Sequence, residues 1–178
     1  MNNAKIIIIG CLLWFMAGAA VVSGAQGVLG VGYGHELRGN DDIGQLELFY
    51  RMPLSYQKDL GPSWKLATAL EFAGAVIDDA DPETSATGRM AFMPQVMLSP
   101  GGAFHFHFGL GLGVMMGETE FAEHNLGGPL FFSAKTGVVV LIGKHFGFEY
   151  NYYHQSNAGI YDYNASLNMH HVAISYRF

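Results

Sequence analysis

Large apolar residues alternate with small or polar residues along most of this chain. In residues 104–114 every even position is large and apolar, and every odd position is histidine or glycine, giving the sequence FHFHFGLGLGV. Successive side chains of a β-strand point to opposite faces, whereas a helix would scatter these residues around its circumference. The pattern therefore predicts a strand with one apolar face.

Seven further segments share this alternation or are glycine-rich or apolar enough to pair with it: 27–35, 45–52, 64–72, 89–98, 130–142, 146–152 and 170–178. A tilted membrane-spanning strand needs about 9–11 residues. The links between the segments are alternately long (36–43, 78–88, 117–128, 157–167) and mostly short (55–62, 99–102, 143–145). Long extracellular loops and short periplasmic turns are typical of outer-membrane barrels, and a chain ending in Phe178 resembles their C-terminal signature.

The polar faces of these segments fit the inside of a narrow barrel. They carry small residues and charges of both signs, at Glu47, Arg51, Lys65, Glu71, Arg89, Lys135, Glu149 and Arg177. Paired charges and small side chains suit an eight-stranded barrel, whose interior is filled by side chains. His105 and His107 are expected there as packed, hydrogen-bonded residues. We predict that odd-numbered residues point inward and even-numbered residues face lipid.

The amino-acid composition excludes several other classes of protein. Only 13% of the residues are charged, against about 25% in soluble domains, and half are hydrophobic, which excludes a disordered chain. A net charge of −6 without a Lys/Arg cluster argues against nucleic-acid binding. The single cysteine excludes a disulfide framework and a four-cysteine zinc site. A soluble β-sandwich remains the alternative to an all-β, eight-stranded antiparallel transmembrane barrel of the outer-membrane type.

The first residues have the form of a secretory signal. Lys5 precedes the apolar run 6–22, and Ser23-Gly24-Ala25 fits a signal-peptidase site. We predict a cleaved signal peptide at 1–25 and a barrel at 26–178, located in the bacterial outer membrane. A membrane anchor and lipidation at Cys11 are the alternatives.

His154 and Ser156 stand two residues apart at the extracellular end of their predicted strand, on its even-numbered, outward face. Side chains so placed come close enough for a hydroxyl to reach an imidazole after modest adjustment. Polar groups facing hydrocarbon cost free energy unless they are paired or functional. The residues alone leave two interpretations open, a functional pair or polar residues in the headgroup layer.

The last 35 or so residues carry a more specific pattern. His154-Gln-Ser156-Asn157-Ala158-Gly159, an asparagine eight residues after the serine and a final strand ending Tyr-Arg-Phe resemble the lipid A 3-O-deacylase (PagL) family. The resemblance implies a serine esterase that removes the acyl chain at position 3 of lipid A, with His154 as general base and Ser156 as nucleophile. It further implies oxyanion donors at the Gly159 N–H and the Asn164 side chain, with Asn157 in the same binding region.

One residue departs from the family pattern. The family has a glutamate twelve residues after the serine, where this chain has Asn168. Asn168 is expected to point outward beside His154, where an amide oxygen can accept from the imidazole but cannot stabilise its charged form. A slower enzyme, a substitute acid such as Asp162 and an inactive barrel with a structural or adhesive role all remain open. The expected partners are lipid A or lipopolysaccharide and the membrane, with a homodimer as an option and with no metal, cofactor or nucleic acid.

Overall fold

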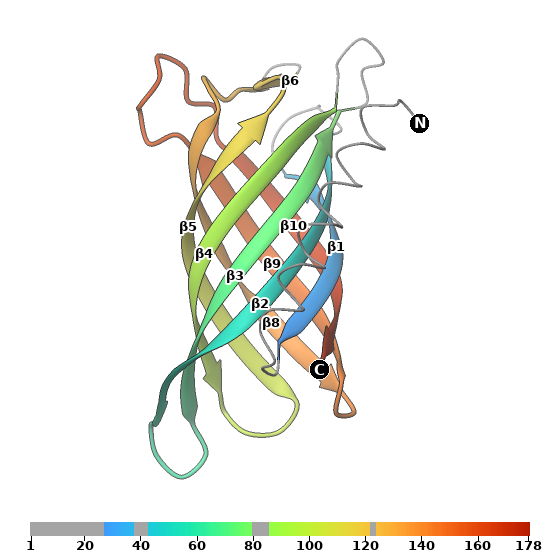
Figure 1. Ribbon diagram of the computed structural model, residues 1–178, viewed down its shortest axis with the longest axis vertical. Coiled ribbons are helices and arrows are strands. Elements are labelled where there is room, and N and C mark those ends of the chain that lie inside the picture. The colour runs from blue at the N-terminus through green and yellow to red at the C-terminus, as the bar shows by residue number, and fades with distance from the viewer. Residues whose placement is uncertain (1–26, 38–42, 80–85, 122–123) are drawn as a thin grey trace.

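The computed structural model describes residues 27–37, 43–79, 86–121 and 124–178, and eight strands in this part of the chain close into one antiparallel barrel (Figure 1). Their order around the barrel is β1-β10-β9-β8-β5-β4-β3-β2. The bounds are β1 Val28–Glu36, β2 Gly44–Asp59, β3 Lys65–Asp78, β4 Thr87–Ser99, β5 Phe104–Met116, β8 Leu130–Ile142, β9 Phe146–Ser156 and β10 Leu167–Arg177. The predicted eight-stranded barrel is confirmed, and the signal peptide predicted at 1–25 lies outside the described residues.

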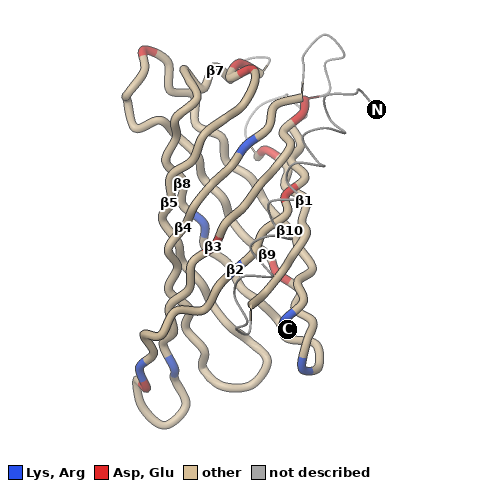
Figure 2. Tube along the Cα trace, viewed as in Figure 1, with Lys and Arg blue, Asp and Glu red and all other residues tan. Residues whose placement is uncertain are grey.

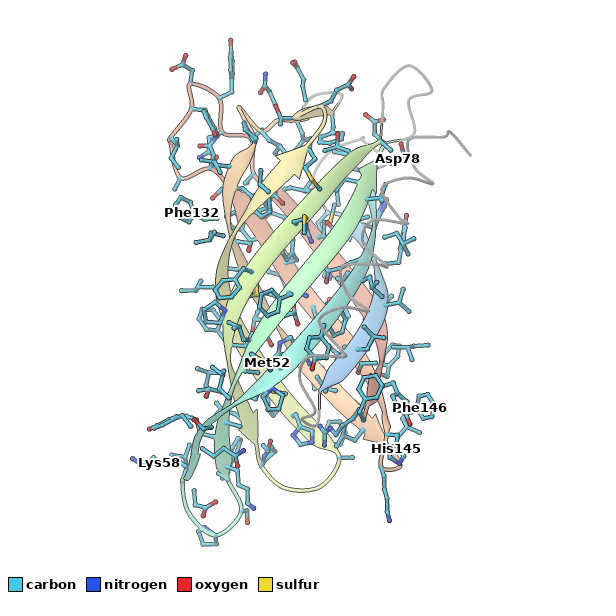
Figure 3. All side chains as sticks on the ribbon, in the orientation of Figure 1. Met52, Lys58, Asp78, Phe132, His145 and Phe146 are labelled. Atoms are coloured by element: carbon cyan, nitrogen blue, oxygen red, sulfur yellow. The ribbon has the colours of Figure 1, made fainter. Side chains whose placement is uncertain are left out.

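The wall of the barrel is apolar outside, and its interior holds charged, polar and small residues together with a few large side chains such as Phe49 and Phe131. In β5, Phe106, Phe108, Leu110 and Leu112 are 46–59% exposed on the outer face. Most of the wall carries no charged residue (Figure 2), and labelled side chains such as Phe132 and Phe146 point away from it (Figure 3). An outward apolar band of this kind is what a membrane barrel presents to lipid. No helix within the described residues is long and apolar enough to cross a bilayer.

Residue parity follows the prediction in β2, β3, β4, β5, β8, β9 and β10 but is reversed in β1. There Val31 and Tyr33 are about half exposed, while the even-numbered glycines Gly30, Gly32 and Gly34 are buried. Val28 pairs with Arg51 and with Arg177, so even residues of β1 share a face with odd residues of both neighbours. A β-carbon on Gly30 would lie 2.2 Å from the Phe49 ring. The glycines of β1 therefore leave room for large lumen side chains.

A closed network of ion pairs fills the middle of the lumen. Arg51 bonds Glu71 at 2.8 Å and Glu149 at 3.1 Å. Lys135 bonds Glu71 at 2.6 Å and Glu47 at 2.8 Å, and Arg89 also bonds Glu47. All six of these side chains are at most 3% exposed. The predicted pairing of lumen charges is confirmed for them.

The remaining residues predicted for the lumen divide between its interior and its end. His107 is buried and contacts Asn151 at 2.6 Å, and His105 contacts Ser99 at 2.6 Å, as expected. Lys65 is instead exposed at the start of β3, because the β2–β3 hairpin extends beyond the barrel, and Arg177 is half-buried at the end of β10.

The two ends of the barrel differ. The turn end holds the 100–103 and 143–145 turns and the C-terminus, and the loop end holds the 117–129 and 157–166 links (Figure 1). The predicted 55–62 link is wrong in its bounds, because β2 continues to Asp59 after a bulge between Pro53 and Gln57. At the loop end, β6 Glu120–Phe121 and β7 His124–Asn125 form a small hairpin.

Candidate active site

His154 and Ser156 lie at the loop end of β9, on the outer face of the barrel. Both are half-buried, whereas Tyr153 and Gln155 beside them are buried in the lumen. Ser156 pairs with Phe132 of β8, whose outward side chain marks the level of this site near the loop end in Figure 3. Strand alternation alone thus turns the imidazole and the hydroxyl to the lipid side.

Asn168 is the cross-strand neighbour of His154 in β10. Its Oδ1 lies 2.8 Å from Nδ1 of the imidazole, and the residue is 3% exposed. Because an amide oxygen only accepts, this contact puts the imidazole proton on Nδ1 and leaves Nε2 with a lone pair. The arrangement has the geometry by which a third residue orients a catalytic histidine.

Ser156 lies one strand repeat beyond His154. Its hydroxyl forms no hydrogen bond to another described residue, so no contact within the described part of the chain holds it away from the imidazole. Nucleophile and base in unoccupied esterase sites are commonly loosely arranged and close up when substrate binds. The pair needs a side-chain adjustment, and the backbone already places both groups on one face.

The 157–166 loop is organised around Asn157. The Asn157 Nδ2 group donates to the backbone oxygens of Leu126 at 2.9 Å and Tyr163 at 2.5 Å, and Oδ1 accepts from the Gly159 N–H at 2.8 Å. The residue is 2% exposed. Its side chain is buried and hydrogen-bonded at both ends, so it ties this loop to the backbone of Leu126.

Ala158 and Gly159 both have left-handed backbone conformations, with φ of 53° and 81°. A left-handed alanine is strained, and such strain concentrates at functional turns. The turn brings the Gly159 N–H onto Oδ1 of Asn157, so this predicted oxyanion donor is occupied in the structure.

Asn164 is held differently. Its Oδ1 accepts from the backbone N–H of Asn157 at 2.9 Å, which fixes the orientation of the amide. Its Nδ2 has no hydrogen-bond partner among the residues that the structure describes. Of the three residues predicted for oxyanion or substrate binding, Asn164 is the one that offers an uncommitted side-chain donor.

Asp162 does not replace the missing acid. It is exposed in the 157–166 loop and makes no hydrogen bond or ion pair with His154 in the described part of the chain. The contact that His154 does make is with Asn168, one strand away. The structure therefore does not bring the predicted substitute acid to His154.

Three residues around Asn168 were missed by the sequence analysis. The Tyr152 hydroxyl donates to Asn168 Oδ1 at 2.9 Å, Asn168 Nδ2 donates to Ser166 Oγ at 3.3 Å, and the Asn168 backbone N–H donates to Glu36 Oε2 at 2.6 Å. Tyr152 shares the even face of β9 with His154, a signal that was visible in the sequence. Glu36 lies in β1, whose reversed parity concealed it.

Within the described residues, no group of three or more His, Cys, Asp or Glu side chains could hold a metal ion. Fold and site together define an outer-membrane-type barrel that carries a histidine, a serine and an asparagine on its outer wall. The family model described as lipid A 3-O-deacylase (PagL) matches residues 44–177, which include all of these residues. The chain therefore belongs to the lipid A 3-O-deacylase family.

Solved structures show the same architecture. The crystal structure of the outer membrane enzyme PagL is 15% identical with a TM-score of 0.69, over 83% of this chain and 97% of that chain. The Yersinia pestis outer membrane protein Ail is 12% identical with a TM-score of 0.52, over 86% of this chain and 99% of that one. No curated protein sequence matches the chain. The protein is an outer-membrane β-barrel of the lipid A deacylase type, and the homodimer stays an untested expectation.

Proposed function

We propose that the protein hydrolyses the ester that joins an acyl chain to position 3 of lipid A, at a site formed by Ser156, His154 and Asn168. The observation that carries this proposal is the 2.8 Å contact between His154 Nδ1 and Asn168 Oδ1 on the outer wall. A polar pair gains nothing structurally from facing lipid, and this one leaves Nε2 free to accept a proton.

The chemistry proceeds in two halves. Ser156 Oγ attacks the ester carbonyl carbon while its proton passes to His154 Nε2. The tetrahedral intermediate collapses, the sugar oxygen leaves with that proton, and the acyl group stays on Oγ. Water then attacks the acyl-enzyme, giving its proton to His154, and the free fatty acid departs as Oγ regains a proton.

Asn164 is the proposed oxyanion donor. Its Nδ2 has no partner in the described ranges, and its Oδ1 is held by the Asn157 backbone, so the donor direction is set before substrate arrives. Preorganised donors of this kind are worth about 10²–10³ in rate. The Gly159 N–H could join it only after Asn157 Oδ1 releases it.

The position of the site fits a membrane substrate. Lipid A lies in the outer leaflet, and a site on the lipid-facing wall can receive an ester laterally. The lumen could not serve this purpose, because ion pairs and buried side chains fill its middle. Catalysis outside the barrel thus needs no opening of the strands.

The test is mass spectrometry of lipid A from cells that produce the wild-type protein, Ser156→Ala or Ser63→Ala. Ser63 is exposed near the turn end and serves as the matched control. We expect loss of one acyl chain from position 3 with wild type and Ser63→Ala, and none with Ser156→Ala. Unmodified lipid A in all three, with folded barrels in each membrane, would favour a structural or adhesive barrel and overturn the proposal.

A further inference from the structure

An asparagine in the place of a catalytic carboxylate has two unlike ends. If Oδ1 faces His154, the imidazole keeps its proton on Nδ1 and Nε2 can take the proton of Ser156. If the amide turns over, Nδ2 donates to Nδ1, the imidazole proton moves to Nε2, and the base is blocked. In a serine protease, exchange of the triad aspartate for asparagine costs about 10⁴ in rate for this reason.

The structure shows what would hold the amide of Asn168 the right way round. Its Oδ1 accepts from two donors, His154 Nδ1–H at 2.8 Å and the Tyr152 hydroxyl at 2.9 Å. Its Nδ2 donates to Ser166 Oγ at 3.3 Å. Turning the amide over would leave the phenol hydrogen of Tyr152 without an acceptor on a wall that faces lipid, because the phenol oxygen could then only accept from Nδ2.

The backbone of Asn168 is fixed independently. Its N–H donates to the Glu36 carboxylate at 2.6 Å, and its carbonyl accepts from the Leu37 N–H at 2.8 Å. With the main chain held on both sides and the residue 3% exposed, rotation of the terminal amide is the principal freedom left. The Tyr152 hydroxyl acts on that freedom, whereas the Ser166 hydroxyl can pair with either end of the amide.

We propose that Tyr152 is a positioning residue that locks the Asn168 amide with its oxygen toward His154, which lets an asparagine orient the catalytic base in place of a carboxylate. The inference rests on the proposed function for its catalytic consequence but not for the tautomer of His154. It also predicts that the effects of changing Tyr152 and changing Asn168 depend on each other. A carboxylate has two equivalent oxygens and nothing to lock, so the need for Tyr152 should vanish when Asn168 becomes an acid.

The kinetic test is a double-mutant cycle on purified, membrane-reconstituted protein with lipid A as substrate. Tyr152→Phe should lower kcat by about 10- to 100-fold, with KM within about twofold. In the Asn168→Glu background, the same Tyr152→Phe change should lower kcat by less than about threefold. Equal losses in both backgrounds would mean that Tyr152 merely supports the wall, and would overturn the proposal.

Tyr150→Phe is the matched control. Tyr150 lies on the same face of β9, but its hydroxyl contacts His170, one row away from Asn168. The Tyr150→Phe change therefore removes a phenol oxygen from the same wall but leaves the contacts of the Asn168 amide in place. We expect unchanged kcat, and a loss as large as that of Tyr152→Phe would contradict the specific role of Tyr152.

A second readout needs no turnover. Nitrogen-15 NMR of histidine-labelled protein in detergent separates the two imidazole tautomers, and His154→Gln identifies the His154 signals. We expect the Nδ1–H form in wild type and in Tyr150→Phe, and a large Nε2–H population in Tyr152→Phe. An unchanged tautomer in Tyr152→Phe overturns the lock. A shifted tautomer in a protein that never deacylates lipid A would keep the lock and refute the proposed function instead.

Discussion

The lumen and the outer wall of this barrel both hold polar networks, but the two are built from different groups. Inside, three carboxylates and three cations bond one another, and each is at most 3% exposed. Outside, the side chains that contact the Asn168 amide are those of tyrosine, histidine and serine, and the one carboxylate at this residue, Glu36, bonds its backbone. Charges are enclosed where they can be paired, and neutral groups face the lipid.

The difference has a physical cause. A buried charge is tolerated only when it is paired, and an ion beside hydrocarbon costs several kcal/mol. A glutamate at position 168 would place a charge on the outer wall with no Lys or Arg among the described residues that contact Asn168, and with the Glu36 carboxylate already on its backbone. An asparagine avoids that cost, but its amide can also turn with Nδ2 toward His154, which would block the base. The Tyr152 hydroxyl would counteract that orientation. Stability and catalysis are therefore opposed at this residue.

The largest expected effect breaks the inner network. Arg51→Met removes the cation that bonds both Glu71 and Glu149. We expect the free energy of unfolding to fall by about 3–5 kcal/mol, because carboxylates remain buried without it. Urea unfolding in lipid vesicles measures this. The double variant Arg51→Met/Glu149→Gln should recover part of the loss, and a single variant as stable as wild type would contradict the role given to these pairs.

The faces of both networks could be predicted from the sequence, but their contacts could not. Alternation put Glu47, Arg51 and Lys135 inside and His154 outside, because a strand allows only two directions for a side chain. It failed in β1, since the parity of a strand relative to its neighbour depends on the register across a loop. The 2.6 Å contact from Glu36 to the Asn168 backbone was hidden by that failure.

The loop beyond β9 was harder still. Its bonds depend on left-handed residues at 158 and 159, which no periodic pattern encodes. For that reason Asn157 and Gly159 were expected to meet the substrate, whereas they bond each other. The orientation of Asn164 emerged only from the contact of its oxygen with the Asn157 backbone.

The next prediction concerns the oxyanion donor on the outer side. Asn164→Ala should lower kcat by about 10²–10³-fold, because the transition state loses a preorganised donor. The variant also loses a single loop hydrogen bond, so its free energy of unfolding should fall by only about 1 kcal/mol. Steady-state kinetics and urea unfolding on the same preparation separate the two. A variant that retains wild-type kcat would remove Asn164 from the mechanism.

Asn168→Glu tests the opposition between charge and catalysis directly. The carboxylate would stabilise the imidazolium of His154, and we expect kcat to rise about tenfold, equivalent to about 1.4 kcal/mol. The same change should lower the free energy of unfolding by about 1–2 kcal/mol, since a charge enters the lipid-facing wall. If both kcat and the free energy of unfolding fell, the expected opposition between charge and catalysis would be refuted, and the amide itself would be what the site requires.

The smallest expected effect belongs to Ser166, the partner of the other end of the amide. Its 3.3 Å contact with Asn168 Nδ2 is long, and a net hydrogen bond of this kind contributes about 0.5–1 kcal/mol. Ser166→Ala should therefore lower kcat by about two- to fivefold and leave KM unchanged. In the Tyr152→Phe background the loss should stay the same, because the Ser166 hydroxyl can accept from Nδ2 or donate to Oδ1 and so does not distinguish the two orientations of the amide. A loss that grows in that background would show that Ser166 shares the lock with Tyr152.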